Sequence, residues 1–154
     1  MSETARIVDQ ALKMFEGGAW HGPSVLEVLA DVNAEVAASY PIPGVHSIWE
    51  LVLHLIATQD AILRRIRGEA AGLKTEDFWL PVPPVSEVAW AETVERLKRQ
   101  ETELRQAIGD FPDERLDAVL VAGGSSAYNN FHGHIQHNAY HAAQIGLLEK
   151  AQRI

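Results

Sequence analysis

Residues 47–68, SIWELVLHLIATQDAILRRIRG, determine how the rest of the chain is interpreted. Ser47 and Glu50 have the spacing of a capping box, in which each side chain accepts a hydrogen bond from the other residue's backbone amide. Apolar residues then recur at helical spacing up to Gly68, a residue type that commonly ends helices. The stretch therefore predicts an amphipathic helix of about 20 residues.

Four other stretches show the same helical period. They are residues 2–16, 24–40, 86–109 and 125–150. No window shows the alternation of a strand, and no period of roughly 20 to 50 residues repeats. At 154 residues the chain has the size of one compact domain. We therefore expect a single all-α domain over residues 1–154, a four-helix bundle with an additional N-terminal helix.

The segment 86–109 shows how the faces of these helices are assigned. The apolar residues expected to face inward are Trp90, Val94, Leu97, Leu104 and Ile108. Its glutamates lie three and four residues from lysines and arginines, an arrangement typical of a solvated face. The charged residues of this helix are therefore expected to face water.

Residues 72–84, GLKTEDFWLPVPP, interrupt the helical pattern. Their prolines exclude a regular helix, yet their aromatic residues make the segment too hydrophobic for a free linker. We expect it to pack on the bundle as a long crossover, with Trp79 at the mouth of a cavity. The other three tryptophans are expected mostly in the core.

Composition excludes several classes of function. The net charge is -8, and the 13 lysines and arginines are scattered along the chain, which argues against binding nucleic acid or an anionic membrane. The absence of cysteine excludes disulfides, thiolate metal ligands and a cysteine nucleophile. The first residues lack the pattern of a signal peptide, and no apolar run reaches the roughly 18 residues of a membrane span. A cytoplasmic location is therefore expected.

The histidines are concentrated near the C-terminus, in the stretch FHGHIQHNAYH of residues 131–141. At about 100° per residue, His134, His137 and His141 fall within an arc of about 60° that continues as an apolar stripe. These imidazoles are therefore expected to point toward the core. His54 raises the same question because it lies among the apolar residues of the helix predicted first.

Two interpretations of these histidines remain open at this point. A lone buried histidine in an apolar helix is usually a hydrogen-bonded core residue. Two imidazoles four residues apart, such as His137 and His141, can instead converge on one ion, and a facing helix can supply a third nitrogen from His54. Because an H-x-x-x-H spacing alone is a weak signal, the pattern leaves metal binding and core packing about equally supported.

Two motifs resemble the DinB/YfiT-like superfamily: SIWELVLHLIATQD and, far downstream, GHIQHNAYHAAQIGLLEKA. The resemblance extends over most of the chain, through WHGPSVLEVL and FWLPVPPVSEVAW. It implies a four-helix bundle whose long crossover joins the second and third bundle helices. It also implies a site in which His54, His137 and His141 bind a divalent metal such as zinc, nickel or iron. Ala143 stands where relatives often have glycine, a change that does not touch these ligands.

The resemblance also implies a chemistry, since characterised relatives include transferases and an isomerase that use low-molecular-weight thiols such as bacillithiol or mycothiol. The expected function is a metal-dependent transferase or hydrolase that activates a thiol or water, acts on a small-molecule substrate and forms a homodimer. Because the chain has no cysteine, the sulfur would come from a cosubstrate. Two alternatives remain: a metal-binding or small-molecule-binding bundle without turnover, and a structural role for the histidines.

Three further residues are candidates for the surroundings of such a site. His134 lies one turn before His137, where it would line the pocket or orient a ligand. His21 precedes the proline that opens the segment 24–40, and it is expected to border the cavity. Glu50 lies one turn before His54, where it would act as a base or as a hydrogen-bond acceptor for a ligand, although its capping box explains it without any chemistry.

Overall fold

The computed structural model describes residues 1–69 and 74–153, and within these residues it contains helices and no strand. In chain order the elements are α1 (Glu3–Glu16), α2 (Val25–Leu29), α3 (Ala34–Ala38), α4 (Ile48–Ile66), the 3-10 helix η1 (Thr75–Phe78), α5 (Glu87–Gly109), the 3-10 helix η2 (Asp113–Arg115) and α6 (Ala127–Ala151). The all-α prediction is confirmed. None of the described helices combines the length and apolar character that a membrane span requires.

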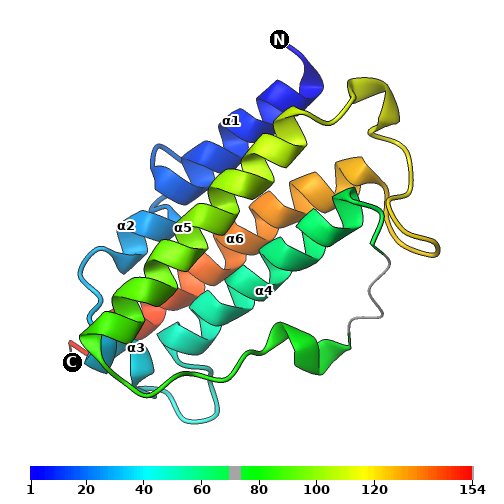
Figure 1. Cartoon of the computed structure of the whole chain (residues 1–154). Coiled ribbons are helices and arrows are strands. Elements are labelled where there is room, and N and C mark those ends of the chain that lie inside the picture. Colours follow the sequence, from blue (N-terminus) through cyan, green and yellow to red (C-terminus); the bar gives the residue numbers. More distant parts are fainter. Residues whose placement is uncertain (70–73, 154) are drawn as a thin grey trace.

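The four long helices α1, α4, α5 and α6 lie side by side as a bundle (Figure 1). Helix α1 packs against both α5 and α6, and α4 packs against the same two helices. The expectation of an additional N-terminal helix outside the bundle is therefore corrected, because α1 is itself one of the four long helices. The short helices α2 and α3 fill the connection between α1 and α4.

The segment 24–40 was expected to form one helix, and the structure corrects this to two short ones. The carbonyl of Val32 accepts a hydrogen bond from the indole of Trp90 on α5 at 2.7 Å, which removes it from a helical ladder. Asn33 then caps α3, because its side chain accepts a hydrogen bond from the Val36 amide at 2.9 Å. A tertiary contact and a local cap together favour the break over a continuous helix.

Helix α4 begins and ends where the sequence predicts. The Ser47 hydroxyl accepts a hydrogen bond from the Glu50 amide at 3.2 Å, and the Glu50 carboxylate accepts one from the Ser47 amide at 2.8 Å. After the helix, Gly68 has a φ of 76°, a left-handed conformation that favours glycine. Both ends of the helix that carries His54 are therefore determined locally.

The crossover between α4 and α5 is long because these two helices run in the same direction (Figure 1). The chain must return the length of the bundle before α5 begins. Residues 72 and 73 of the predicted crossover lie outside the described residues. The remainder contains η1, which packs on α4, and then Trp79, Leu80 and Val82, which pack against the core. The prediction of a packed crossover is confirmed for this part.

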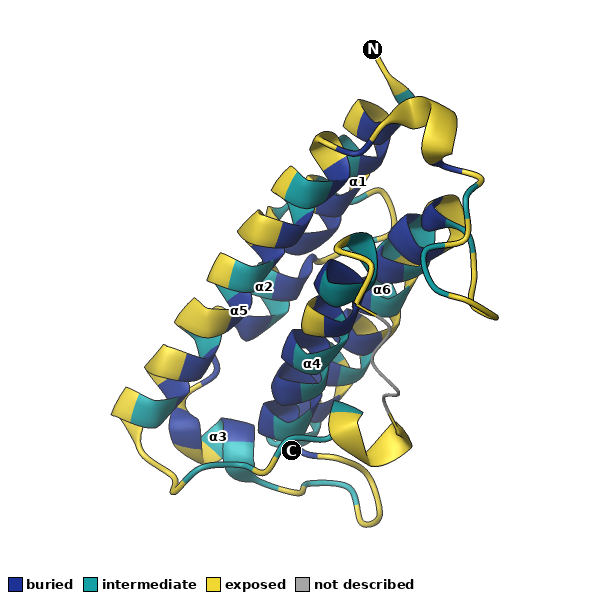
Figure 2. Ribbon diagram, turned by 45° about the vertical axis from the view of Figure 1, so that its right-hand side comes forward, coloured by how far each residue is buried: buried dark blue, intermediate teal, exposed yellow. Residues whose placement is uncertain are grey.

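Buried residues line the sides of the long helices that face one another (Figure 2). The apolar ones among them form two clusters. Helices α4, α5 and α6 contribute to both. The cluster residues nearest the boundary are Ile56 and Ile62, Leu97 and Leu104, and Phe131 and Ala142. The helix positions between them carry buried polar side chains, Gln59, Glu101, His134 and Asn138. A polar layer therefore crosses the bundle between two hydrophobic clusters.

Two sequence-based expectations about burial need correction. Glu101 was expected on the solvated face of α5, yet it is fully buried, because its spacing from Leu97 and Leu104 places it on the inner face. Among the tryptophans, Trp49 and Trp90 are buried as expected, whereas Trp20 is completely exposed. The burial of Glu101 could have been predicted from the apolar period of α5. The exposure of Trp20 could not have been predicted from its neighbours in the sequence.

Candidate metal centre

Two helices bring the three predicted ligands together. His54 comes from α4, and His137 and His141 come from one face of α6, four residues apart. The Nε2 atom of His137 lies 3.0 Å from Nε2 of His54 and 3.1 Å from Nε2 of His141. One potential ligand atom from each residue lies within 4.8 Å of the others, so the group has the size of a metal site.

The crossover orients the His54 ring. Its Nδ1–H donates a hydrogen bond to the backbone carbonyl of Phe78 at 2.9 Å. The indole of Trp79 stacks on the same ring, with centroids 4.2 Å apart and planes at 10°. His46 stacks on the other face of this indole at 3.7 Å. The crossover thus fixes both the rotation of the imidazole and the nitrogen that carries its proton.

A residue of α6 itself orients the His141 ring. Its Nδ1–H donates to the side-chain oxygen of Gln144 at 2.6 Å. Tyr140, largely exposed beside it, meets the ring edge-on at 5.0 Å. As with His54, the hydrogen bond at Nδ1 leaves Nε2 without a proton, so that its lone pair points into the cluster.

The positions of the protons on the three imidazoles favour the binding of a cation between them. His54 and His141 both direct a lone pair toward Nε2 of His137, which holds at most one proton and can satisfy only one of them. When His137 carries its proton on Nδ1, three lone pairs converge. Such convergence is repulsive without a positive ion and is the arrangement that metal-binding histidines adopt, with the other nitrogen hydrogen-bonded to a neighbouring group. His54 and His141 meet this condition, whereas Nδ1 of His137 is buried without a hydrogen-bond partner among the described residues.

The imidazoles are also held in the neutral form that binds metals. Burial lowers the pKa of His137 to about 3, and the neighbouring His141 and His54 add to this effect. Burial likewise lowers the pKa of His54, although its hydrogen bond to the Phe78 carbonyl acts in the opposite direction. The pKa of His141 is lowered by burial, against the raising effect of Gln144. At neutral pH no proton has to be displaced for a metal to bind.

His134 lies inside the core, one turn along α6 from the three-histidine cluster. It is 1% exposed, and its Nε2 lies 2.9 Å from a carboxylate oxygen of Glu101, which is 0% exposed. His134 therefore shares the inward arc of His137, as predicted, but its partner is a carboxylate of α5 and not the other histidines. It belongs to the polar layer described above.

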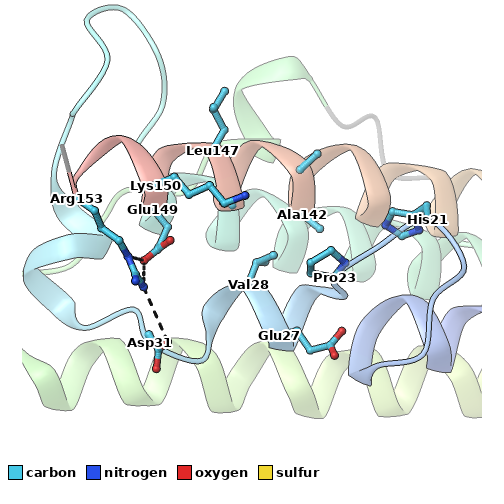
Figure 3. Close-up of a pocket in the computed structure, with 12 residues that line it drawn as sticks. His21, Pro23, Glu27, Val28, Asp31, Ala142, Leu147, Glu149, Lys150 and Arg153 are labelled. Atoms are coloured by element: carbon cyan, nitrogen blue, oxygen red, sulfur yellow. Dashed lines mark hydrogen bonds and ion pairs between the residues drawn. The ribbon is translucent and has the colours of Figure 1, made fainter.

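Glu50 and His21 lie in other surroundings. The Glu50 carboxylate forms the capping box of α4 and lies 3.3 Å from Nδ1 of His46. Its pKa is lowered: burial acts to raise it, but hydrogen bonds from Ser47, Tyr40 and His46 outweigh that effect. His21 borders a groove between α2 and α6 (Figure 3). Neither residue is hydrogen-bonded to a member of the three-histidine cluster in the described structure.

This groove has a volume of about 520 Å³ and is bordered by Pro23 and Val28 on one side and Ala142 and Leu147 on the other (Figure 3). None of the three clustered histidines lines it. At about 100° per residue, its α6 residues lie on the side of the helix opposite His137 and His141. The groove is therefore a separate feature, and the chemistry of this protein is better sought at the histidines.

Three functional contacts were missed from the sequence. Gln144 lies three residues after His141 on the same helix face, so its spacing was a usable signal. Glu101 was detectable as a carboxylate among apolar inner positions. The Phe78 carbonyl left no sequence signal, because every residue has this group and only the path of the crossover brings it to His54.

Comparison with known protein families shows which family the chain is related to. A sequence profile of the DinB superfamily matches residues 20–145, a region that contains all three clustered histidines. Comparisons with curated proteins and with solved structures returned no match.

Proposed function

Because this chain belongs to the DinB superfamily, we propose that it is a divalent-metal-dependent enzyme of the thiol S-transferase type. The observation that supports the proposal most directly is the convergence of three Nε2 atoms from His54, His137 and His141. Zinc, nickel and iron all accept imidazole ligands, so the donor set is compatible with each.

The donor set also indicates the kind of chemistry. Three neutral nitrogen ligands are typical of catalytic sites, which keep a position open for water or substrate. A divalent ion in such a site would lower the pKa of a bound thiol or water. The deprotonated ligand would then be available as a nucleophile near neutral pH. The chain contributes no sulfur of its own, so a thiol would enter as a cosubstrate.

The residues around the histidines provide orientation and shielding. The Phe78 carbonyl and the Gln144 side chain hold the protons of His54 and His141 on Nδ1, away from the centre. Trp79 covers one face of His54 and keeps water from that side. These contacts fix the ligand geometry before an ion binds, which reduces the reorganisation that binding requires.

A second candidate function is metal or small-molecule binding without turnover. The hydrogen-bond partners of the ligands in the described structure are a backbone carbonyl and a carboxamide. Neither group donates or accepts a proton readily, whereas catalysis usually requires a nearby acid or base. This feature favours binding alone unless the substrate or the cosubstrate supplies the proton transfer.

Turnover by the metal-loaded protein distinguishes the two functions. Protein loaded separately with zinc, nickel and iron would be incubated with a low-molecular-weight thiol and a panel of electrophiles, and thioether formation followed by mass spectrometry. The proposal expects product only with metal, and none with His137→Ala, which lacks a ligand.

His132→Ala is the matched control, since this histidine of the same helix lies outside the cluster and should leave turnover intact. Tight metal binding without product from any thiol or water reaction would favour the binding function. Product formation in chelator-treated protein would contradict the metal-dependent mechanism.

A further inference from the structure

The polar layer of the bundle core consists of Gln59, Glu101, His134 and Asn138, none of which is one of the three proposed metal ligands. All four side chains are at most 1% exposed. Glu101 Oε2 accepts a hydrogen bond from Gln59 Nε2 at 2.8 Å and lies 2.9 Å from His134 Nε2. One carboxylate oxygen on α5 therefore contacts both α4 and α6.

This network also extends to the fourth long helix. The other Glu101 oxygen, Oε1, lies 4.0 Å from Nε of Arg105, one turn further along α5. The Arg105 guanidinium donates to Glu16 at the end of α1 at 2.7 Å. Glu101 thus makes close polar contacts with α4 and α6, and a longer ion pair through Arg105 links it toward α1, although Oε1 accepts no hydrogen bond among the described residues.

The partners of Glu101 are close in sequence to the clustered histidines. His134 precedes His137 by one turn on α6, and Asn138, 3.3 Å from His134 Nε2, directly follows His137. On α4, Gln59 lies five residues after His54. A rotation of α6, or a slide of α4 along its axis, would separate the Nε2 atoms of the cluster and would also break the contacts to Glu101.

Stability alone does not explain a carboxylate at this position. Replacing a buried ionic group and its partners by well-packed apolar residues is often neutral or stabilising, because burying the charge has a desolvation cost. The best-documented benefit of a buried polar group in a helical core is a defined register between helices. A metal site built from two helices needs such a register, because its ligand atoms must meet within a few tenths of an ångström.

We propose that Glu101 is a positioning residue for the three-histidine cluster. From α5, which supplies none of the three histidines, it sets the rotation and register of α4 and α6 so that Nε2 of His54, His137 and His141 converge. The inference rests on the proposed metal site and adds to it the residue that maintains its geometry.

Cobalt(II) binding tests this role, because the ligand-field absorption of the ion reports the geometry of its ligands independently of turnover. Glu101→Leu is expected to lower cobalt affinity by about 10- to 100-fold, the usual effect of losing a group that orients ligands, and to change the absorption spectrum. Glu101→Gln should retain most of the affinity and the native spectrum. Its amide oxygen, placed where Oε2 lies, can accept from both Gln59 Nε2 and His134 Nε2.

The matched control is Leu104→Ala, which opens a cavity three residues further along the same inner face of α5. This variant should lose stability while keeping the cobalt spectrum and affinity of the unaltered protein. If Glu101→Leu does not fold, Gln59→Leu takes its place, because it removes only the contact to α4 and is expected to change the spectrum in the same way.

The outcomes separate this inference from the proposed function. If the unaltered protein bound no cobalt, zinc or nickel, the proposed function itself would be wrong. If it bound cobalt and the folded Glu101→Leu or Gln59→Leu variant showed the same affinity and spectrum, only the positioning role of Glu101 would be overturned. Equal losses in Glu101→Leu and Leu104→Ala would also overturn it, because they would show a general effect of stability.

Discussion

His134 and His137 are one turn apart on the same face of α6, yet they lie in different chemical surroundings. His137 meets two other imidazoles at 3.0 and 3.1 Å. His134 meets the buried carboxylate of Glu101 at 2.9 Å. Residue type and helix face are the same, so the difference comes from what the neighbouring helices place opposite each ring: His54 on α4 in one case and Glu101 on α5 in the other.

The comparison shows that an inward histidine has no fixed role. Opposite other neutral imidazoles, its lone pair becomes a potential metal ligand. Opposite a carboxylate, the same ring becomes a donor in a core hydrogen bond. Substitutions at His134 and at the clustered histidines measure how far the two positions differ.

The largest effect is expected from removing a clustered histidine. His54→Ala, His137→Ala and His141→Ala should each lose most divalent-metal binding, because the two remaining ligands form a site open to water. His134→Ala should keep one metal per chain when metal is in excess. Elemental analysis of the four variants gives the stoichiometry, and circular dichroism shows that they remain folded. Full, tight metal binding by folded His137→Ala would mean that the clustered imidazoles serve packing and hydrogen bonding instead.

The next effect is on the free energy of unfolding, for which His134 is expected to matter more than His137. His134→Ala leaves Glu101 buried with Gln59 but without its imidazole partner, and removing one partner of a buried pair costs about 3–5 kcal/mol of the free energy of unfolding. Urea denaturation of the metal-free protein measures this loss. His132→Ala, the control on the same helix, should change the free energy of unfolding by less than about 1 kcal/mol. A similar small change for His134→Ala would show that the contact with Glu101 contributes little.

A smaller effect is expected on how the free energy of unfolding depends on pH. The three clustered histidines have lowered pKa values in the folded protein, about 3 for His137, against about 6.5 in an unfolded chain. Well above pH 6.5 these imidazoles are neutral in both the folded and the unfolded state. Below it the unfolded chain binds protons that the folded protein does not, so the free energy of unfolding should fall as the pH drops from 6.5 toward 3.

Chelator-treated protein unfolded in urea at pH 7.5, 6 and 5 provides this measurement. In His137→Gln, which lacks the most strongly shifted imidazole, the free energy of unfolding should fall less steeply with pH. A profile as steep as that of the unaltered protein would assign the pH dependence to other groups.

The smallest effect is expected at the outer surface of α6, on the exposed stripe that carries Tyr140, Ala143 and Leu147. Tyr140 and Leu147 are 62% and 60% exposed and lie seven residues apart with Ala143 between them, the spacing of a helix-pairing seam. We propose that this face pairs with a second copy to form a homodimer. Light scattering should give a mass near twice 17.0 kDa, and Leu147→Glu should shift it toward a single chain.

Val88→Glu is the control, because Val88 on α5 is 70% exposed and lies outside this seam. It should leave the mass unchanged. A single-chain mass for the unaltered protein at micromolar concentration would contradict the dimer.

The sequence by itself determined the parts of this protein that depend on local chemistry. The capping box of Ser47 and Glu50, the stop at Gly68 and the apolar period of each long helix are properties of neighbouring residues, and they predicted helix type and most boundaries. The inward arc of His134, His137 and His141 followed from helix geometry in the same way. The motif resemblance then selected His54 as the third member, and the structure brings it to the other two.

Only the tertiary structure decided which partner each inward residue meets. The break between α2 and α3 depends on Trp90, the proton position of His54 depends on the Phe78 carbonyl, and the burial of Glu101 becomes understandable once Gln59 and His134 surround it. These contacts join residues 24 to 58 positions apart in the chain. Helical period reports which way a side chain points, but the group it meets there depends on how separate helices pack, and that packing is a property of the whole bundle.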